Sequence, residues 1–304
     1  MKLFVSGLIN VETNLRVRSF PVTYYPIDYP FFGINTTISG VGYNVSMAAK
    51  TLGDEVVFSS LIGKDHEGKR ISHKLDGSGV ARDYVFECLD ATPVSVILYE
   101  QGGRRQIYCD LKDIQDKSLE VDKVKDAVLA ADVCILCNSN FNRVLLPIAK
   151  QAGKQIATDV HVLNDIYDPF NRDFMENADI LFLSDEDIPC SPRDFLIRLK
   201  DAYQAKIIVI GLGEEGAIMY ERATDGITRV SAVNLGGVVN TVGAGDALFT
   251  AFNHYYFKGC GAVESLKKAE VFAALKIRHD GGAVGFSTEQ EVEDIYNSYG
   301  FQVN

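Results

Sequence analysis

The chain has 304 residues, of which 47% are hydrophobic and 23% are charged. These proportions are those of an ordinary globular protein, and they exclude a disordered chain, a collagen-like repeat and a coiled coil. The 30 Lys and Arg residues are outnumbered by 41 Asp and Glu, which gives a net charge of -11. A duplex nucleic-acid binder normally carries a basic face, so we expect no nucleic-acid partner.

The first residues do not predict a signal peptide, because their apolar run is short and breaks at Ser6 and Gly7. No apolar stretch approaches the roughly 20 residues that a membrane-spanning helix needs, so we expect no membrane partner. The six cysteines are scattered along the chain, at positions 88, 109, 134, 137, 190 and 260. Scattered thiols in a large chain are typical of a reducing compartment, so we expect a cytoplasmic protein.

Residues 2–5 predict a first strand, followed by a turn that contains glycine. The next segment, residues 11–39, is rich in Tyr, Phe and Pro and shows no helical period, which favours short edge strands and turns. A helix is predicted over residues 43–52, because apolar residues recur there at i, i+3, i+4 and i+7. Gly53 then suits the position that ends a helix.

Later short apolar runs predict buried strands, at residues 56–63, 132–137, 155–160, 179–184 and 206–211. Periodic stretches such as 144–151 and 194–203 lie between them and predict helices. Strands that alternate with helices indicate a parallel sheet.

One segment interrupts this alternation. Residues 93–100 and 104–109, joined by Gln101, Gly102 and Gly103, predict a β-hairpin. With residues 11–39, this hairpin predicts a small sheet set apart from the main one.

The strongest candidate for a catalytic motif is Asn-Thr-Val-Gly-Ala-Gly-Asp at 240–246, which is followed by a predicted helix. The amide groups of Gly243, Ala244 and Gly245 would gather at the helix N-terminus and form an anion site. Asp246 would repel a bound phosphate, but it suits a base that takes a proton from a hydroxyl attacking that phosphate. The alternative is a plain helix start, with Asp246 as a first-turn acid that the helix dipole favours.

A second glycine-containing turn, residues 39–44, also precedes a predicted helix. Its two glycines would let a ligand approach the backbone, and Asn44 can donate and accept hydrogen bonds. The alternative is an ordinary turn into a helix.

Gly211, Gly213 and Gly216 match the dinucleotide fingerprint G-x-G-x-x-G. The fingerprint needs a helix after the glycines, whereas the residues from Ala217 onward predict another strand. We therefore reject a dinucleotide fingerprint, although the turn could still border a nucleotide. The chain has no G-x-x-x-x-G-K-[ST] motif, and Ser184 to Asp187 reads as a solvated acidic loop whose carboxylates could hold Mg²⁺ through water.

Taken together, these segments resemble the ribokinase, or PfkB, family of carbohydrate kinases. Residues 240–246 are similar to the C-terminal signature of that family, and residues 39–53 to its N-terminal signature. Residues 60–71, 211–220 and 273–288 fit the intervening segment, the nucleotide-side turn and the C-terminal wall of the adenine pocket. The order and spacing hold over nearly the whole chain.

The resemblance implies an α/β fold: three layers, a doubly wound and mainly parallel sheet, and a small β-sheet lid. The core would comprise residues 1–10, 40–91 and 112–304, and the lid residues 11–39 and 92–111. The resemblance further implies an ATP-dependent phosphotransferase that moves the γ-phosphate to a primary hydroxyl of a small sugar, with Mg²⁺. Asp246 would be the base, and Gly243, Ala244 and Gly245 the anion hole.

The same resemblance assigns binding residues. The acceptor would meet Asn10, Glu12, Gly40, Gly42, Asn44 and Asn138. The nucleotide would meet Ser184, Gly211, Gly213, Gly216, Thr241, Gly243, Gly245, Ala274 and Gly282. Asp187 would contribute to a metal site through water.

The chain departs from the family pattern at several of these positions. Glu12 stands where the family usually has Asp, which changes the hydroxyl that the carboxylate reaches. Ser39 replaces the first glycine of the N-terminal signature, and Ser184 and Asp187 stand where N-x-x-E is common. Asn240 replaces the commoner Asp, which weakens any assignment of a monovalent-cation site because a carboxylate is lost.

Two other functions stay open at this point. Aromatic residues at 20–32 could stack on a nucleobase, which would make the protein a nucleoside kinase, although such residues more often pack a small sheet. A ligand-binding protein that kept the fold and lost the chemistry is the second alternative. An exposed lid sheet also favours a homodimer through its edges.

Overall fold

Two β-sheets organise the residues that the computed structural model describes, which are 1–101 and 104–301. The larger sheet has nine strands in the order β13-β12-β11-β10-β9-β8-β1-β4-β5. Its strands are β1 (Lys2–Ser6), β4 (Glu55–Gly63), β5 (Tyr84–Leu89), β8 (Val133–Leu136), β9 (Gln155–Asp159), β10 (Ile180–Ser184), β11 (Ile207–Gly211), β12 (Ala217–Glu221) and β13 (Gly226–Val230). All neighbours are parallel except at β12 and β13, which are antiparallel to their neighbours.

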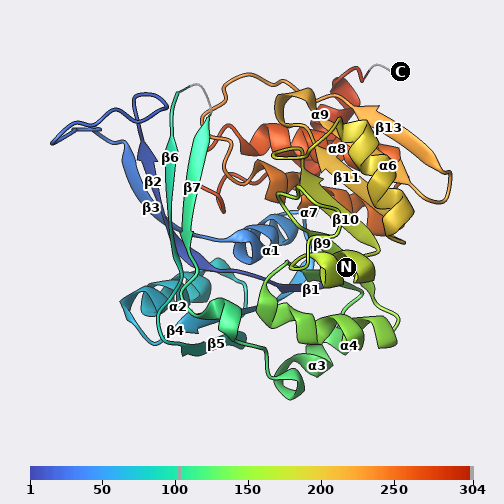
Figure 1. The fold of residues 1–304 in the computed structure, drawn as a ribbon, viewed down its shortest axis with the longest axis horizontal. Helices are drawn as coiled ribbons and strands as arrows, with labels where there is room; N and C mark the ends of the chain where they lie inside the picture. Colours follow the sequence, from blue (N-terminus) through green and yellow to red (C-terminus); the bar gives the residue numbers. More distant parts are fainter. Residues whose placement is uncertain (102–103, 302–304) are drawn as a thin grey trace.

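Helices cover both faces of the large sheet (Figure 1). One face packs against α1 (Val41–Thr51), α2 (His66–Ser78), α7 (Ala244–Phe257), α8 (Ala262–Lys276) and α9 (Glu289–Ser298). The other packs against α3 (Val121–Ala130), α4 (Leu146–Gln151), α5 (Arg172–Asn177) and α6 (Pro192–Ala202). Short 3₁₀ helices occupy Ile114–Asp116, Asn140–Leu145 and Gly213–Glu215.

Strand alternation explains the two cores. On β11, Ile207 and Val209 belong to the first core, whereas Ile208 and Ile210 belong to the second. Successive side chains of a strand point to opposite faces, so a strand that is apolar throughout must be covered on both sides. The predicted three-layer, doubly wound fold is confirmed. In the described part of the chain, no helix has the length and apolarity needed to cross a membrane.

The smaller sheet has the order β3-β2-β6-β7 and projects from one side of the core (Figure 1). Its strands are β2 (Asn10–Arg16), β3 (Ile34–Ser39), β6 (Val94–Tyr99) and β7 (Arg105–Asp110). The last two form the predicted antiparallel hairpin, and its expected turn residues Gly102 and Gly103 lie outside the described residues. We call these four strands the lid sheet.

The aromatic residues between β2 and β3 do not pack the lid sheet. Tyr24 is 84% exposed, and Phe32 is fully exposed. Tyr29 and Phe31 stack on each other at 6.2 Å between ring centroids. Residues 17–33 form no strand, so this part of the chain has no second layer against which the rings could be buried.

The turn at Gly211, Gly213 and Gly216 joins two antiparallel strands, as the rejection of a dinucleotide fingerprint requires. Gly216 has a φ of +93°, and a Cβ there would lie 2.1 Å from the Val230 carbonyl oxygen. Glycine is therefore needed for the turn itself.

Asp65 fixes the start of α2. Its carboxylate accepts hydrogen bonds from the Gly68 amide at 2.8 Å, the Thr92 amide at 2.8 Å and the Thr92 hydroxyl at 2.6 Å. Burial alone would raise the pKa of Asp65, but these hydrogen bonds outweigh it and lower the pKa. One side chain therefore caps a helix and anchors the loop that leads into β6.

We expect Asp65→Ala to lower the free energy of unfolding by about 2 kcal/mol, the upper range for an N-cap, because three donors lose their acceptor. Urea unfolding measures the change. The isosteric Asp65→Asn keeps one acceptor oxygen and should lose less. Since the native pKa is lowered, the ionic part of the stabilisation is present above the unfolded pKa and disappears as the pH falls through the native one. Equal stability of wild type and Asp65→Ala at neutral pH would contradict this role.

Candidate active site

The N-terminus of α7 offers free amide groups. Gly243 caps the helix with a φ of +79°, and a Cβ there would lie 2.6 Å from the Gly282 carbonyl oxygen. The Ala244 amide donates to the Thr241 carbonyl at 3.2 Å. In the described part of the chain, the amides of Gly243, Gly245 and Asp246 have no backbone acceptor. Free amides at the positive end of a helix bind anions.

Asp246 lies in the first turn of α7, and Asn44 from α1 holds it. The Asn44 Nδ2 donates to Asp246 Oδ2 at 2.7 Å, and the Asn44 Oδ1 accepts from the Ser39 hydroxyl at 3.1 Å. Ser39 ends β3, so the chain of bonds runs from the lid sheet through α1 to α7, the helices seen side by side in Figure 1. Gly282 packs on the same junction, since a Cβ there would lie 2.4 Å from the Ser39 hydroxyl.

The pKa of Asp246 is raised, and burial is the main cause. The pKa is lowered in part by the charge of His161, by the hydrogen bond from Asn44 and by the charge of Lys276. The negative charge of Asp159 raises it further. A general base works best when its pKa approaches the working pH. The raised pKa distinguishes Asp246 from an exposed first-turn acid, whose carboxylate the helix dipole favours.

The inner face of the lid sheet carries polar side chains that have unused acceptors. Asn10, Glu12 and Asn14 alternate along β2 and are buried. Asn14 donates to Glu12 Oε1 at 3.0 Å, and Asn10 donates to the Ser95 hydroxyl at 3.0 Å. Among the described residues, the Oδ1 atoms of Asn10 and Asn14 have no partner. Buried polar atoms are normally paired, so each of these two oxygens lacks the donor that a buried acceptor usually has.

Gly40 and Gly42 let α1 pack against the turn after β1. Gly40 has a φ of +106°, and the Gly42 amide donates to the Leu8 carbonyl at 3.0 Å. A Cβ on Gly42 would lie 2.5 Å from the Gly7 carbonyl carbon. Both glycines are therefore required by close backbone approach, and they place Asn44 one turn further along.

Asn138 lies just after β8 and donates to Asn171 Oδ1 at 3.0 Å and to the Val160 carbonyl at 3.4 Å. These contacts do not include the other predicted acceptor residues. Ala274 is buried in α8 and belongs to the hydrophobic core.

The remaining predicted nucleotide-side residues, and the predicted metal residue Asp187, lie in loops or at the ends of strands. The Ser184 hydroxyl accepts from the Glu186 amide at 3.2 Å, and Asp187 is exposed with a φ of +65°. The Thr241 hydroxyl and carbonyl accept from Arg105, at 2.8 and 3.0 Å. Arg105 thus joins strand β7 of the lid sheet to the loop that precedes the anion site.

Sequence reasoning missed Arg105, His161 and Lys276. None of the three is marked by its neighbours in the sequence, and each comes near the site through tertiary packing. His161 has a φ of +60° and lies two residues after the end of β9. That left-handed conformation is uncommon outside glycine, but it leaves no mark in the sequence.

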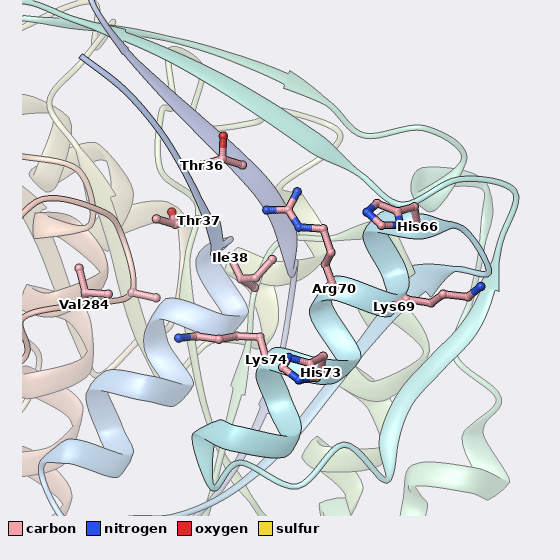
Figure 2. A pocket seen from close by; sticks show the side chains of 10 residues that line it. Thr36, Thr37, Ile38, His66, Lys69, Arg70, His73, Lys74 and Val284 are labelled. Carbon is pink, nitrogen blue, oxygen red and sulfur yellow. The ribbon is translucent and has the colours of Figure 1, made fainter. Parts of the chain in front are cut away.

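A cavity of about 560 Å³ opens beside this site, against the outer edge of the lid sheet. Figure 2 shows Arg70 and Lys74 reaching from α2 toward β3 and the loop at Val284. The wall is formed by Thr36, Thr37, Ile38, His66, Lys69, Arg70, His73, Lys74, Ala283 and Val284. None of these is a predicted site residue, so the groove is a basic neighbour of the candidate site. In a chain of net charge -11, it gives this edge a local positive potential.

Comparison with known proteins gives this site its context. The model of the "pfkB family carbohydrate kinase" matches residues 2–289. The chain belongs to this family. The predicted resemblance is confirmed, and the protein is a phosphotransferase of the class that acts on hydroxyl groups.

Individual pfkB relatives are distant but cover nearly the whole chain. The fructosamine kinase FrlD of Bacillus subtilis is 23% identical over 274 residues, 90% of this chain and 93% of that protein. The microbiome-derived acarbose kinase Mak1 has a TM-score of 0.86 at 22% identity, covering 97% of this chain and 98% of its own. Arabidopsis thaliana ribokinase, solved with ribose and ATP, has a TM-score of 0.79 at 20% identity with the same coverage.

We expect Asp246→Asn to raise the free energy of unfolding at neutral pH. The native pKa of Asp246 is raised, so the native state binds more protons than the unfolded state between the two pKa values. Stability therefore falls as the pH rises through that window, and the amide removes this loss. The gain should shrink as the pH approaches the unfolded value, about 3.9.

Urea unfolding of both proteins across this pH range measures the effect. The matched control is Asp122→Asn, which removes an exposed acid from the first turn of α3. There, the helix dipole favours the carboxylate, so the control should lose a little stability. If Asp246→Asn behaves like the control, the plain helix-start interpretation is right.

Proposed function

We propose that this pfkB kinase transfers the γ-phosphate of ATP to a primary hydroxyl of a small sugar or sugar derivative. The observation that carries the proposal is the Asn44–Asp246 hydrogen bond of 2.7 Å beside the free amides of α7. A carboxylate beside an anion site repels the bound phosphate, so its presence there needs a chemical explanation. Deprotonation of a hydroxyl that attacks a phosphate provides one.

In the proposed step, Asp246 takes the hydroxyl proton while the hydroxyl oxygen forms a bond to the γ-phosphorus. The bond from that phosphorus to the bridging oxygen breaks, and ADP leaves. Asn44 binds Asp246 Oδ2, and in the part of the chain that the structure describes Oδ1 has no hydrogen-bond donor. Oδ1 is therefore the oxygen that would face the acceptor.

The free amides of Gly243, Gly245 and Asp246 would bind the transferring phosphoryl group. Charge spreads over its equatorial oxygens during transfer, and preorganised donors stabilise that charge. Mg²⁺, which commonly binds through substrate phosphates and one or two carboxylates, would supply further neutralisation when bound. Asp187 is our candidate to hold it through water, and Ser184, Gly213 and Thr241 our candidates to border the nucleotide.

The acceptor site favours a sugar over a nucleoside. Asn10, Glu12 and Asn14 present amide and carboxylate groups that match several hydroxyls. All six cysteines are free thiols, which supports our proposal of a reducing, cytoplasmic compartment.

We expect ADP release to depend on an acceptor with a primary hydroxyl, in a coupled assay over a panel of sugars, sugar amines and nucleosides. Asp246→Asn should lower turnover by about 10²- to 10⁴-fold, the range for loss of a general base. Calorimetry should show ATP binding close to that of the wild type. Because the base must be ionised, wild-type turnover should fall on the acid side, with its midpoint above the ordinary Asp pKa.

Three outcomes would count against parts of this proposal. Full turnover of Asp246→Asn would remove the base from that residue. Turnover on nucleosides alone would select the nucleoside kinase. No ADP release with any acceptor would favour a protein that binds ligands without catalysis.

We also propose a homodimer through the outer face of the lid sheet. Thr13, Thr36, Val96 and Tyr108 lie in one row across its four strands. Val96 is 38% exposed and Tyr108 is 52% exposed, and a second copy of the chain would cover them. We expect light scattering to give the dimer mass for wild type and the monomer mass for Tyr108→Asp. Leu129→Asp, on α3, is the control, and a monomeric wild type would contradict the proposal.

A further inference from the structure

Lys276 is a buried lysine behind the anion site. It ends α8 and has 0% of its surface exposed, and lysine is almost never fully buried without a charged partner. Its ammonium donates to the Val242 carbonyl at 3.1 Å and lies 5.9 Å from the centroid of the Phe286 ring. Among residues 1–101 and 104–301, no carboxylate forms an ion pair with it.

Lys268, on the same helix, shows how the chain treats a lysine with a structural role. Its ammonium lies 2.9 Å from Glu264 and 2.9 Å from Glu293, and these two carboxylates raise its pKa despite burial. Lys276 has the opposite balance. Burial lowers its pKa to about 8, although Asp246, Asp280 and Glu12 each raise it.

The fold gains little stability from this arrangement. Burying an ammonium that has one carbonyl partner costs free energy, and an apolar side chain of similar volume would avoid that loss. Buried groups held at such a loss cluster at functional sites. The location of Lys276 agrees, because Val242 directly precedes Gly243 in the loop of free amides.

We propose that Lys276 is a positioning residue for phosphate at the α7 N-terminus, an inference that rests on the proposed function of this site. The ammonium holds the Val242 carbonyl and so fixes the loop from Val242 to Gly245 with its amides toward the ligand. It also provides a positive charge that lowers the pKa of Asp246 on α7 and of Glu12 on the lid sheet. That charge offsets the negative charge that a nucleotide phosphate brings.

The first test is nucleotide binding without turnover, with ATP and adenosine as probes in calorimetry. We expect Lys276→Met to weaken ATP binding about tenfold or more, since it removes a charge-assisted interaction, and to leave adenosine binding unchanged. Lys268→Met is the matched control and should bind both probes like the wild type. An equal effect of Lys276→Met on both probes, or none on either, overturns the proposal.

The free energy of unfolding distinguishes a positioning role of Lys276 from a structural one. Lys276→Met should raise the free energy of unfolding at neutral pH, because the buried ammonium is removed. Lys268→Met should lower it, because two carboxylates lose their partner. A large loss of stability in Lys276→Met would show that the lysine supports the fold.

The pH dependence of the wild type tests the same idea without a variant. The ammonium is the form that carries the positive charge behind the loop of free amides, so ATP affinity should fall as the pH rises through about 8, and adenosine affinity should not. The acids whose negative charges act on Lys276 are Asp246, Asp280 and Glu12. Flat ATP affinity across it contradicts the proposal. Because binding is measured without an acceptor, this result is independent of whether any acceptor is turned over.

Discussion

The hydrogen bond between Asn44 and Asp246 joins parts of the chain that are 202 residues apart. It requires α1 and α7 to lie together on one face of the large sheet, and it requires the turn at Gly40 and Gly42 to hold α1 against the end of β1. Ser39 extends the link to the lid sheet. The position of the candidate base therefore depends on the packing of three elements, and none of them defines the site alone.

Burial and charge oppose one another throughout this region. Asp246 and Glu12 have raised pKa values because they are buried, and Lys276 has a lowered pKa for the same reason. Each of the acids is nevertheless stabilised by the positive charge of Lys276. Asp246, in contrast, raises the pKa of Glu12 by repulsion, so a change in one of the three groups alters the protonation of the others.

Local sequence patterns predicted the strands, the helix after Gly243 and the choice of Asp246 as the candidate base. Each of these depends on residues that are close together in the sequence. The covered parallel sheet followed from apolar runs between periodic stretches. The roles of Arg105 and Lys276 were not predictable in this way. A lone lysine at the end of a helix usually reaches solvent, and only the packing of α8 against α7 encloses this one. For the aromatic residues at 20–32 the sequence left two alternatives, stacking on a nucleobase or packing of a small sheet, and their exposure argues against the second.

The unpaired oxygens of Asn10 and Asn14 have a consequence for selectivity. A sugar that places a hydroxyl against each one satisfies a buried atom, whereas a deoxy analogue leaves it without a donor at a loss of about 1–3 kcal/mol. Discrimination among similar sugars then arises mainly from the cost of leaving a buried oxygen unpaired when the analogue lacks a hydroxyl. The hydrogen bond gained with the complete sugar contributes less. In the acceptor site that we propose, strand β2 would therefore select for acceptor stereochemistry.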